Sequence, residues 1–199
     1  MLDMRRLRRS ELPVDTVALA RYLIGKTLIR DTPQGRMSGR IVETEAYVVG
    51  DAAAHSFIGK TKRNQSTFLK RGHAYVYFVY GNWYAINVSG ETEGIGAAVL
   101  IRALEPLEGI KLMKRRRPKA AAHELARGPG CLTTALGIDR RYDGLDLCAP
   151  GPIWLGVASG PTGRIGRSVR IGITKNAHPL LRFYERGNPC VSGPARLRV

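Results

Sequence analysis

Short runs in which apolar and polar residues alternate fill much of the chain, and this period of two residues is typical of β-strands. Two such runs, at 26–30 and 39–45, flank the turn-forming residues 32–35 and predict a hairpin. Three more runs are separated only by short links and predict an antiparallel meander, at 74–80, 84–89 and 96–103.

Helical spacing of apolar residues is confined to short segments, such as 17–23 and 106–113. A further short strand is expected at 169–173, and the polar segment 49–72 predicts an ordered loop with a functional role. Helices and strands do not alternate regularly, which disfavours a doubly wound or barrel fold. The pattern therefore predicts one α+β domain, residues 1–199, built around a curved, largely antiparallel β-sheet with peripheral helices.

Charge is the feature of composition that bears most on function. Lys and Arg total 32 against 16 Asp and Glu, which gives a formal net charge of +16, while 44% of the residues are hydrophobic. A chain of this composition folds, so the excess positive charge lies on a folded surface and favours a polyanionic partner: DNA, RNA or an anionic membrane surface.

The cysteines and the apolar runs indicate the compartment. Cys131, Cys148 and Cys190 form no CxxC pair, which argues against a disulfide framework or a structural zinc site. No apolar run reaches the roughly 18 residues of a membrane span. We therefore expect a soluble, cytoplasmic protein, or a nuclear one in a eukaryote.

Two glutamates in the run 39–45 are the first candidates for chemistry. Alternation sends Glu43 and Glu45 to the same face of the strand. They have three interpretations: an edge strand whose glutamates neutralise arginines, a general base that orients a water, or a Mg²⁺ site that includes Asp51.

Aromatic residues gather in the run 74–80. Tyr75 and Tyr77 share a face, and Tyr80 lies beside the turn at Gly81. The three tyrosines are either core residues of the sheet or a surface that stacks on bases and wedges into a duplex.

Three polar residues and one basic cluster add weaker signals. His55 alone is usually a hydrogen-bonded surface residue, and Asn87 is unusual in a strand because asparagine is depleted there. Arg102 leaves an apolar run, either snorkelling to the surface or directed at a carboxylate or phosphate. The cluster 111–119 is either a solvated helix end or a contact to a nucleic-acid backbone.

Taken together, these segments resemble the alkyladenine (3-methyladenine) DNA glycosylases in order and spacing, from about Leu12 to Ser192. The resemblance rests on Glu43-Thr44-Glu45-Ala46-Tyr47, Asp51-Ala52-Ala53-Ala54-His55-Ser56, Arg63-Asn64, Tyr75-Val76-Tyr77-Phe78-Val79-Tyr80-Gly81, Asn87-Val88, Val99-Leu100-Ile101-Arg102-Ala103-Leu104-Glu105-Pro106, Gly128-Pro129-Gly130-Cys131-Leu132 and Leu181-Arg182-Phe183-Tyr184.

The resemblance implies a repair enzyme that flips alkylated or deaminated purines out of double-stranded DNA and hydrolyses their N-glycosidic bond. It implies no metal or other cofactor, no membrane partner and a monomeric enzyme. It also implies a role for each matching residue: Glu45 as general base, Arg102 as its partner in positioning water, Tyr47, His55, Tyr77 and Asn87 as the base pocket, and Tyr80 as the intercalating wedge.

This chain departs from the family pattern at some positions. Cys131 stands where lysine is common, which questions a phosphate contact there, while Lys62 and Thr67 replace a common proline and methionine. Two rival hypotheses from other classes are a non-catalytic RNA- or DNA-binding protein and a metal-dependent nuclease.

Overall fold

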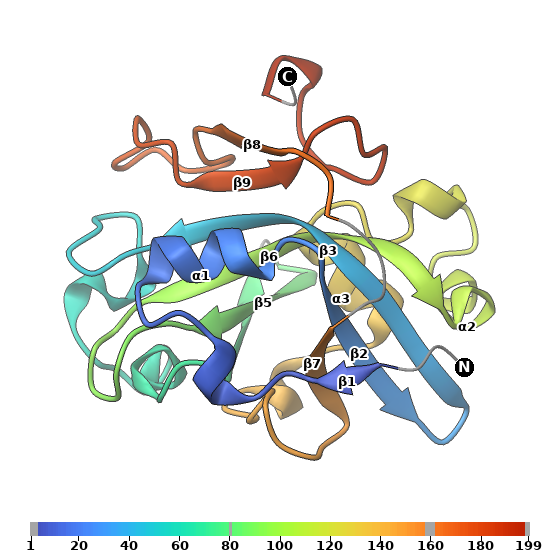
Figure 1. The fold of residues 1–199 in the computed structure, drawn as a ribbon, viewed down its shortest axis with the longest axis horizontal. Helices are drawn as coiled ribbons and strands as arrows, with labels where there is room; N and C mark the ends of the chain where they lie inside the picture. The colour runs from blue at the N-terminus through green and yellow to red at the C-terminus, as the bar shows by residue number, and fades with distance from the viewer. Residues whose placement is uncertain (1–3, 80, 158–161, 198–199) are drawn as a thin grey trace.

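The computed structural model describes residues 4–79, 81–157 and 162–197, and in these residues one antiparallel sheet runs through the molecule (Figure 1). Its described strands are β1 (Arg5–Arg6), β2 (Lys26–Thr32), β3 (Gly35–Tyr47), β4 (Ala74–Val79), β5 (Trp83–Ser89), β6 (Ala98–Glu108), β7 (Ile153–Val157), β8 (Ile165–Ser168) and β9 (Arg182–Glu185). The strand order is β1-β7-β2-β3-β6-β5-β4, with β9 pairing to both β3 and β8. The predicted α+β fold is confirmed.

Strand β3 is the centre of the sheet. One of its edges pairs with β6 along most of its length, and the other edge pairs first with β2 and then, from Glu43 to Glu45, with β9. Figure 1 shows β8 and β9 at the top of the view, with β9 beside β3 and β8 on the outer side of β9. The hairpin of β2 and β3 and the meander of β4, β5 and β6 were both expected from alternation, and both are present.

Three α-helices among the described residues cover the sheet. Asp15 caps the first helix by accepting a hydrogen bond from the Ala18 N–H at 2.7 Å, and the third helix begins with Pro129, whose missing N–H leaves no donor unpaired there. The helices are α1 (Thr16–Leu23), which packs on β3 and β6, α2 (Ile110–Arg116), which packs on α3, and α3 (Pro129–Leu136), which packs on β5 and β6.

Short 3₁₀ turns complete the elements: η1 (Arg9–Glu11), η2 (His55–Ile58), η3 (Gln65–Phe68), η4 (Ala122–Glu124), η5 (Arg140–Tyr142) and η6 (Ala195–Leu197). Both η2 and η3 lie in the predicted functional loop 49–72. The Asn64 side chain holds this loop, because its amide donates to the carbonyls of His55 and Gly59 at 2.8 Å each. The loop is therefore ordered, as the sequence predicts.

Two predicted elements are wrong. The helix expected over 106–113 starts only at Ile110, because β6 continues to Glu108 in register with β3. A register shift beside Gly39 accommodates Pro106 in the pairing, and Gly109 with φ +72° makes the turn into α2. The strand expected at 169–173 is absent, because that segment engages buried carboxylates instead of a neighbouring strand.

Candidate active site

Two carboxylates are buried in the middle of the sheet. Glu43 and Glu45 are 0% exposed, and both contact Arg102 of β6. Thr44, between them, faces α1 and donates its hydroxyl to the Ala20 carbonyl at 2.8 Å. The prediction that the glutamates share a face is confirmed, whereas an edge strand is wrong because β3 has neighbours on both sides.

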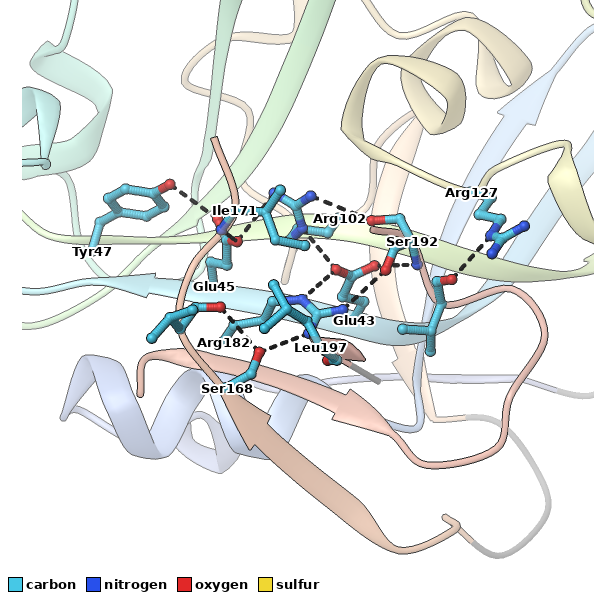
Figure 2. A network of polar contacts seen from close by, with 12 residues as sticks. Glu43, Glu45, Tyr47, Arg102, Arg127, Ser168, Ile171, Arg182, Ser192 and Leu197 are labelled. Carbon is cyan, nitrogen blue, oxygen red and sulfur yellow. Dashed lines mark hydrogen bonds and ion pairs between the residues drawn. The ribbon is translucent and has the colours of Figure 1, made fainter. Parts of the chain in front are cut away.

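Glu45 is held by one ion pair and two hydrogen bonds, from three parts of the chain (Figure 2). Arg102 Nη1 lies 3.1 Å from Oε1, and the Ile171 backbone N–H donates to the same oxygen at 2.7 Å. The Tyr47 hydroxyl donates to Oε2 at 3.0 Å. A carboxylate oxygen accepts about two hydrogen bonds, and the contacts of the described residues give Oε2 one donor, the Tyr47 hydroxyl.

Burial and ion pairing move the pKa values of the two carboxylates in opposite directions. Burial raises the pKa of Glu45, and the nearby Arg102 offsets this only in part. Burial also acts on Glu43, but Arg102 and Arg182 outweigh it and lower the pKa of that carboxyl. Glu43 is therefore fixed as an anion, while Glu45 is a stronger base than an ordinary carboxylate.

A cavity of about 330 Å³ opens beside this pair, at the lower end of the range for small-ligand sites. Glu45 is buried and does not itself line the cavity. It contacts Tyr47 and Arg102, and both of these side chains line the cavity. The predicted pocket residues all line this cavity: Tyr47, His55, Tyr77 and Asn87, together with Arg102. The structure thus brings them together.

Aromatic rings form one side of the cavity. The ring centroids of Tyr75 and Tyr77 are 5.2 Å apart in a stacked arrangement, and His55 meets Tyr77 edge-on at 4.5 Å. Tyr75 is 2% exposed, and its hydroxyl lies 2.8 Å from His55 Nδ1. Burial and the positive charge of Arg63 lower the pKa of His55, which favours a neutral imidazole. Asn87 donates its amide to the Tyr75 carbonyl at 3.1 Å.

A second buried ion pair supports Tyr47 from behind. The Arg170 guanidinium pairs with Asp51, with both side chains 0% exposed, and stacks 4.6 Å from the centre of the Tyr47 ring. Arg170 also donates to the Ala46 carbonyl at 3.0 Å. Arg170 does not line the cavity, whereas Tyr47 does. The next residue, Ile171, is thereby presented to Glu45.

Two basic grooves lie on the surface near α3. One, of about 550 Å³, contains Trp83, Cys131 and cations that include Arg116, Arg117, Lys119 and Arg127. The other, of about 440 Å³, shares Arg116 and adds Arg30 and Arg141. Pro129, at the start of α3, lines the aromatic cavity, and its near neighbours Arg127 and Cys131 line the first groove, so the groove and the cavity lie close together.

Comparison with known proteins identifies the family. The model of the methylpurine-DNA glycosylase family matches residues 10–189. The chain belongs to this family. It is therefore a DNA glycosylase, a hydrolase of N-glycosyl bonds that serves DNA repair, and the alternative of a non-catalytic binding protein is wrong.

Full-length relatives agree with this assignment. A protein of Mesorhizobium japonicum is 62% identical over 192 residues, which cover 96% of this chain and 92% of the relative. A protein of Paraburkholderia phytofirmans is 51% identical, covering 97% and 91%, and one of Methanocella arvoryzae is 46% identical, covering 89% and 90%. All three carry the name "Putative 3-methyladenine DNA glycosylase".

Two further features of the glycosylase concern metals and membranes. Within residues 4–79, 81–157 and 162–197, no three or more His, Cys, Asp or Glu side chains gather in a way that could hold a metal ion. Asp51, considered as a Mg²⁺ ligand, instead pairs with Arg170. Over the same residues, no helix has the length and apolar character needed to cross a membrane.

The predicted wedge Tyr80 lies outside the described residues. The strands on either side of it form a hairpin in which Val79 pairs with Trp83, and Phe78 and Trp83 are 48% and 39% exposed. Both strands of this hairpin therefore expose aromatic surface.

Sequence reasoning missed two contributors to the site of the glycosylase. Ile171 acts through its backbone N–H, which leaves no signal in the side-chain pattern. Arg170 lies in a segment that alternation assigned to a strand, and its partner Asp51 is distant in the sequence. The side-chain alternation that places Tyr75 beside Tyr77 did indicate a shared face, although it could not show that Tyr75 holds His55.

Proposed function

We propose that the glycosylase rotates damaged purines out of double-stranded DNA into the aromatic cavity and releases them by attack of water, leaving an abasic site. The observation that supports this proposal is the buried Glu45, which has a raised pKa and is held by Arg102 and Tyr47, two residues that line the cavity. The substrates are purines altered by alkylation or deamination: 3-methyladenine, 7-methylguanine, hypoxanthine and ethenoadenine.

The chemistry follows from the position of Glu45. A water on Oε2 would donate one proton to the carboxylate, and its oxygen would form the new bond to C1′ of the sugar. The N-glycosidic bond breaks with its electron pair going to the purine, so a cationic alkylpurine leaves as a neutral base. An uncharged purine such as hypoxanthine or ethenoadenine leaves as an anion, which then takes up the proton that Glu45 received from the water. The anionic carboxylate also stabilises the positive charge that develops on the sugar, and Arg102 orients the carboxylate.

The cavity walls support selection of cationic bases. Tyr77 offers its ring to a positively charged purine through a cation–π contact. Tyr47 can contribute less, because the Arg170 guanidinium already lies over its ring. The neutral form of His55 avoids repelling the cationic base, which a protonated imidazole would do. Asn87, in the wall of the same cavity, is proposed to disfavour the exocyclic amino group of guanine.

The two basic grooves are proposed to bind the phosphate backbone of the duplex. A base in a duplex is inaccessible, so an enzyme that acts on it needs both phosphate contacts and a side chain that fills the vacated space. The groove that contains Lys119 and Arg127 starts beside Pro129 at the cavity, which suits a strand running past the flipped nucleotide. Tyr80 is proposed as the wedge.

One incubation tests this function. Duplex DNA treated with a methylating agent is incubated with the protein in EDTA, and both free purines and strand breaks are measured. Release of 3-methyladenine and 7-methylguanine without strand breaks supports the proposal, and hypoxanthine or ethenoadenine duplexes extend it to the other substrates. Strand cleavage that stops in EDTA, without free purines, would contradict it.

A further inference from the structure

Glu43 accepts three hydrogen bonds from buried protein donors and does not line the cavity. Its Oε1 accepts from Arg102 Nε at 2.8 Å and from Arg182 Nε at 2.7 Å, and its Oε2 accepts from the Ser192 N–H at 2.7 Å (Figure 2). Glu43 is 0% exposed, so these protein donors stand in for water. Both of its oxygens are bound to protein donors, so any effect of Glu43 on catalysis passes through one of these neighbours.

Arg102 is the neighbour that both carboxylates share. Its Nε is bonded to Glu43 and its Nη2 donates to the Ser192 hydroxyl at 3.3 Å, while Nη1 lies 3.1 Å from Glu45. A guanidinium is planar, so fixing Nε and Nη2 also fixes the direction of Nη1. The orientation of Arg102 toward Glu45 is therefore set by its hydrogen bonds to Glu43 and to the Ser192 hydroxyl.

Arg182 and the C-terminal segment keep Glu43 in place. Arg182 is 0% exposed and donates to the Ser192 carbonyl at 3.0 Å and to the Leu197 carbonyl at 2.6 Å. Ser192 and Leu197 lie beyond residues 10–189, the stretch that the family model matches. The support for Arg102 thus includes backbone groups of this chain outside the matched stretch.

We propose that Glu43 is a positioning residue which, together with Arg182 and Ser192, holds the guanidinium of Arg102 in the plane that orients Glu45 for catalysis. This inference rests on the proposed role of Glu45 as the base. It predicts that the geometry of residue 43, and not only its charge, controls the rate of excision.

Two substitutions separate geometry from charge. Glu43→Asp keeps the charge but is one methylene shorter, so it cannot reach both arginine Nε atoms and the Ser192 N–H at once. Glu43→Gln keeps the length but loses the charge and places an NH₂ group against donors. We expect each to lower the single-turnover excision rate at least tenfold while changing the affinity for damaged duplex less than threefold.

The pH profile of Glu43→Asp gives a readout that a general weakening of the fold would not change. The groups around Glu45 are Arg102 from β6, Tyr47 and residue 43 from β3, the Ile171 N–H, and Arg182 from β9 behind residue 43. A loosened Arg102 stabilises the charged carboxylate less, so the pKa of Glu45 rises. The acid limb of the rate profile should then move to higher pH.

A double-mutant cycle tests whether Glu43 acts through Arg102. Arg102→Met removes the guanidinium through which Glu43 would act. The double variant Arg102→Met/Glu43→Gln should therefore be less than threefold slower than Arg102→Met alone. The matched control is Glu105→Asp, the same change at a β6 carboxylate that pairs with Arg40 of β3. It should leave both rate and pH profile unchanged.

The outcomes are distinguishable. A folded Glu43→Asp protein with the original rate and acid limb overturns the positioning role, as does an undiminished effect of Glu43→Gln in the Arg102→Met background. If Glu43→Asp does not fold, Ser192→Ala decides: it removes only the hydroxyl that holds Arg102 Nη2, and an unchanged acid limb in that variant also overturns the role. Glu45→Gln is measured in parallel, because full activity there would show that the proposed base is wrong, independently of Glu43.

Discussion

Removing the Arg170 guanidinium tests how the second buried ion pair supports the site. In Arg170→Met, the side chain still fills the space behind Tyr47, but Asp51 loses its cationic partner. Breaking a buried ion pair by removing one partner typically destabilises a protein by about 3–5 kcal/mol. Asp51 retains the Ala53 N–H at 3.0 Å and the Asn176 amide at 2.8 Å. We therefore expect the lower end of that range.

A loss of about 3 kcal/mol corresponds to a fall in Tm of roughly 6–12 °C for a chain of this size. Thermal unfolding followed by circular dichroism measures it. The matched control is Arg141→Met, which removes a 79% exposed partner of Asp139 and should leave Tm unchanged. A fall in the Arg170→Met protein no larger than in this control would contradict the calculation.

The same variant has a predicted effect on catalysis. Arg170 anchors the segment that presents the Ile171 N–H to Glu45, and this hydrogen bond favours the charged carboxylate. Its loss should raise the pKa of Glu45 further. The acid limb of the excision profile should move to higher pH at a temperature where the variant is still folded. An unmoved acid limb would show that Ile171 is held independently of Arg170.

Three other predictions concern the pocket, the groove and the wedge. Tyr47→Phe keeps the ring but removes the hydroxyl that donates to Glu45. We expect excision at neutral pH to be about fivefold slower, which corresponds to roughly 1 kcal/mol of activation free energy. If the substitution acts by raising the pKa of Glu45, the rate should recover fully at higher pH. Lys119→Gln should weaken binding to damaged and undamaged duplex equally and reduce the slope of log affinity against log salt by about 0.9, while Arg186→Gln, outside both grooves, should not. Tyr80→Ser should weaken capture of a lesion in paired DNA more than capture of the same lesion opposite an abasic site, and a 2-aminopurine reporter beside the lesion that shows no change would refute the wedge.

Local sequence patterns predicted much of the fold correctly. Alternation over Glu43, Thr44 and Glu45 is enough to place both carboxylates on one face, because neighbouring side chains of a strand point in opposite directions. The turn at 32–35 likewise predicts the β2–β3 hairpin correctly. Such signals depend only on residues close in the sequence.

The wrong predictions concern segments whose secondary structure is determined by tertiary contacts. Pro106 suggests the start of a helix, but pairing with β3 keeps this region in β6. The segment at 169–173 has the residues of a strand, yet Arg170 and Ile171 bind Asp51 and Glu45 instead. These partners are more than a hundred residues away, and no local pattern can indicate which of them a side chain will meet.

The site was predictable to a similar extent. The family resemblance implied that Tyr47, His55, Tyr77 and Asn87 form one pocket, and the structure gathers all four around one cavity. What the sequence could not show is the burial of Glu45 and the bonding of Glu43, since both depend on how β6, β9 and the C-terminal segment pack around β3. Those contacts set the opposite pKa shifts of the two carboxylates.

The central claim is that Glu45 is the base that activates water, and single-turnover excision by Glu45→Gln tests it most directly. The amide preserves the shape of the side chain but cannot accept the proton, so the variant should bind a damaged duplex normally and fail to release the purine. Excess enzyme and a 7-methylguanine duplex isolate the chemical step, and a binding titration of the same duplex supplies the control. Release at the rate of the unaltered protein, with normal binding, would contradict the account.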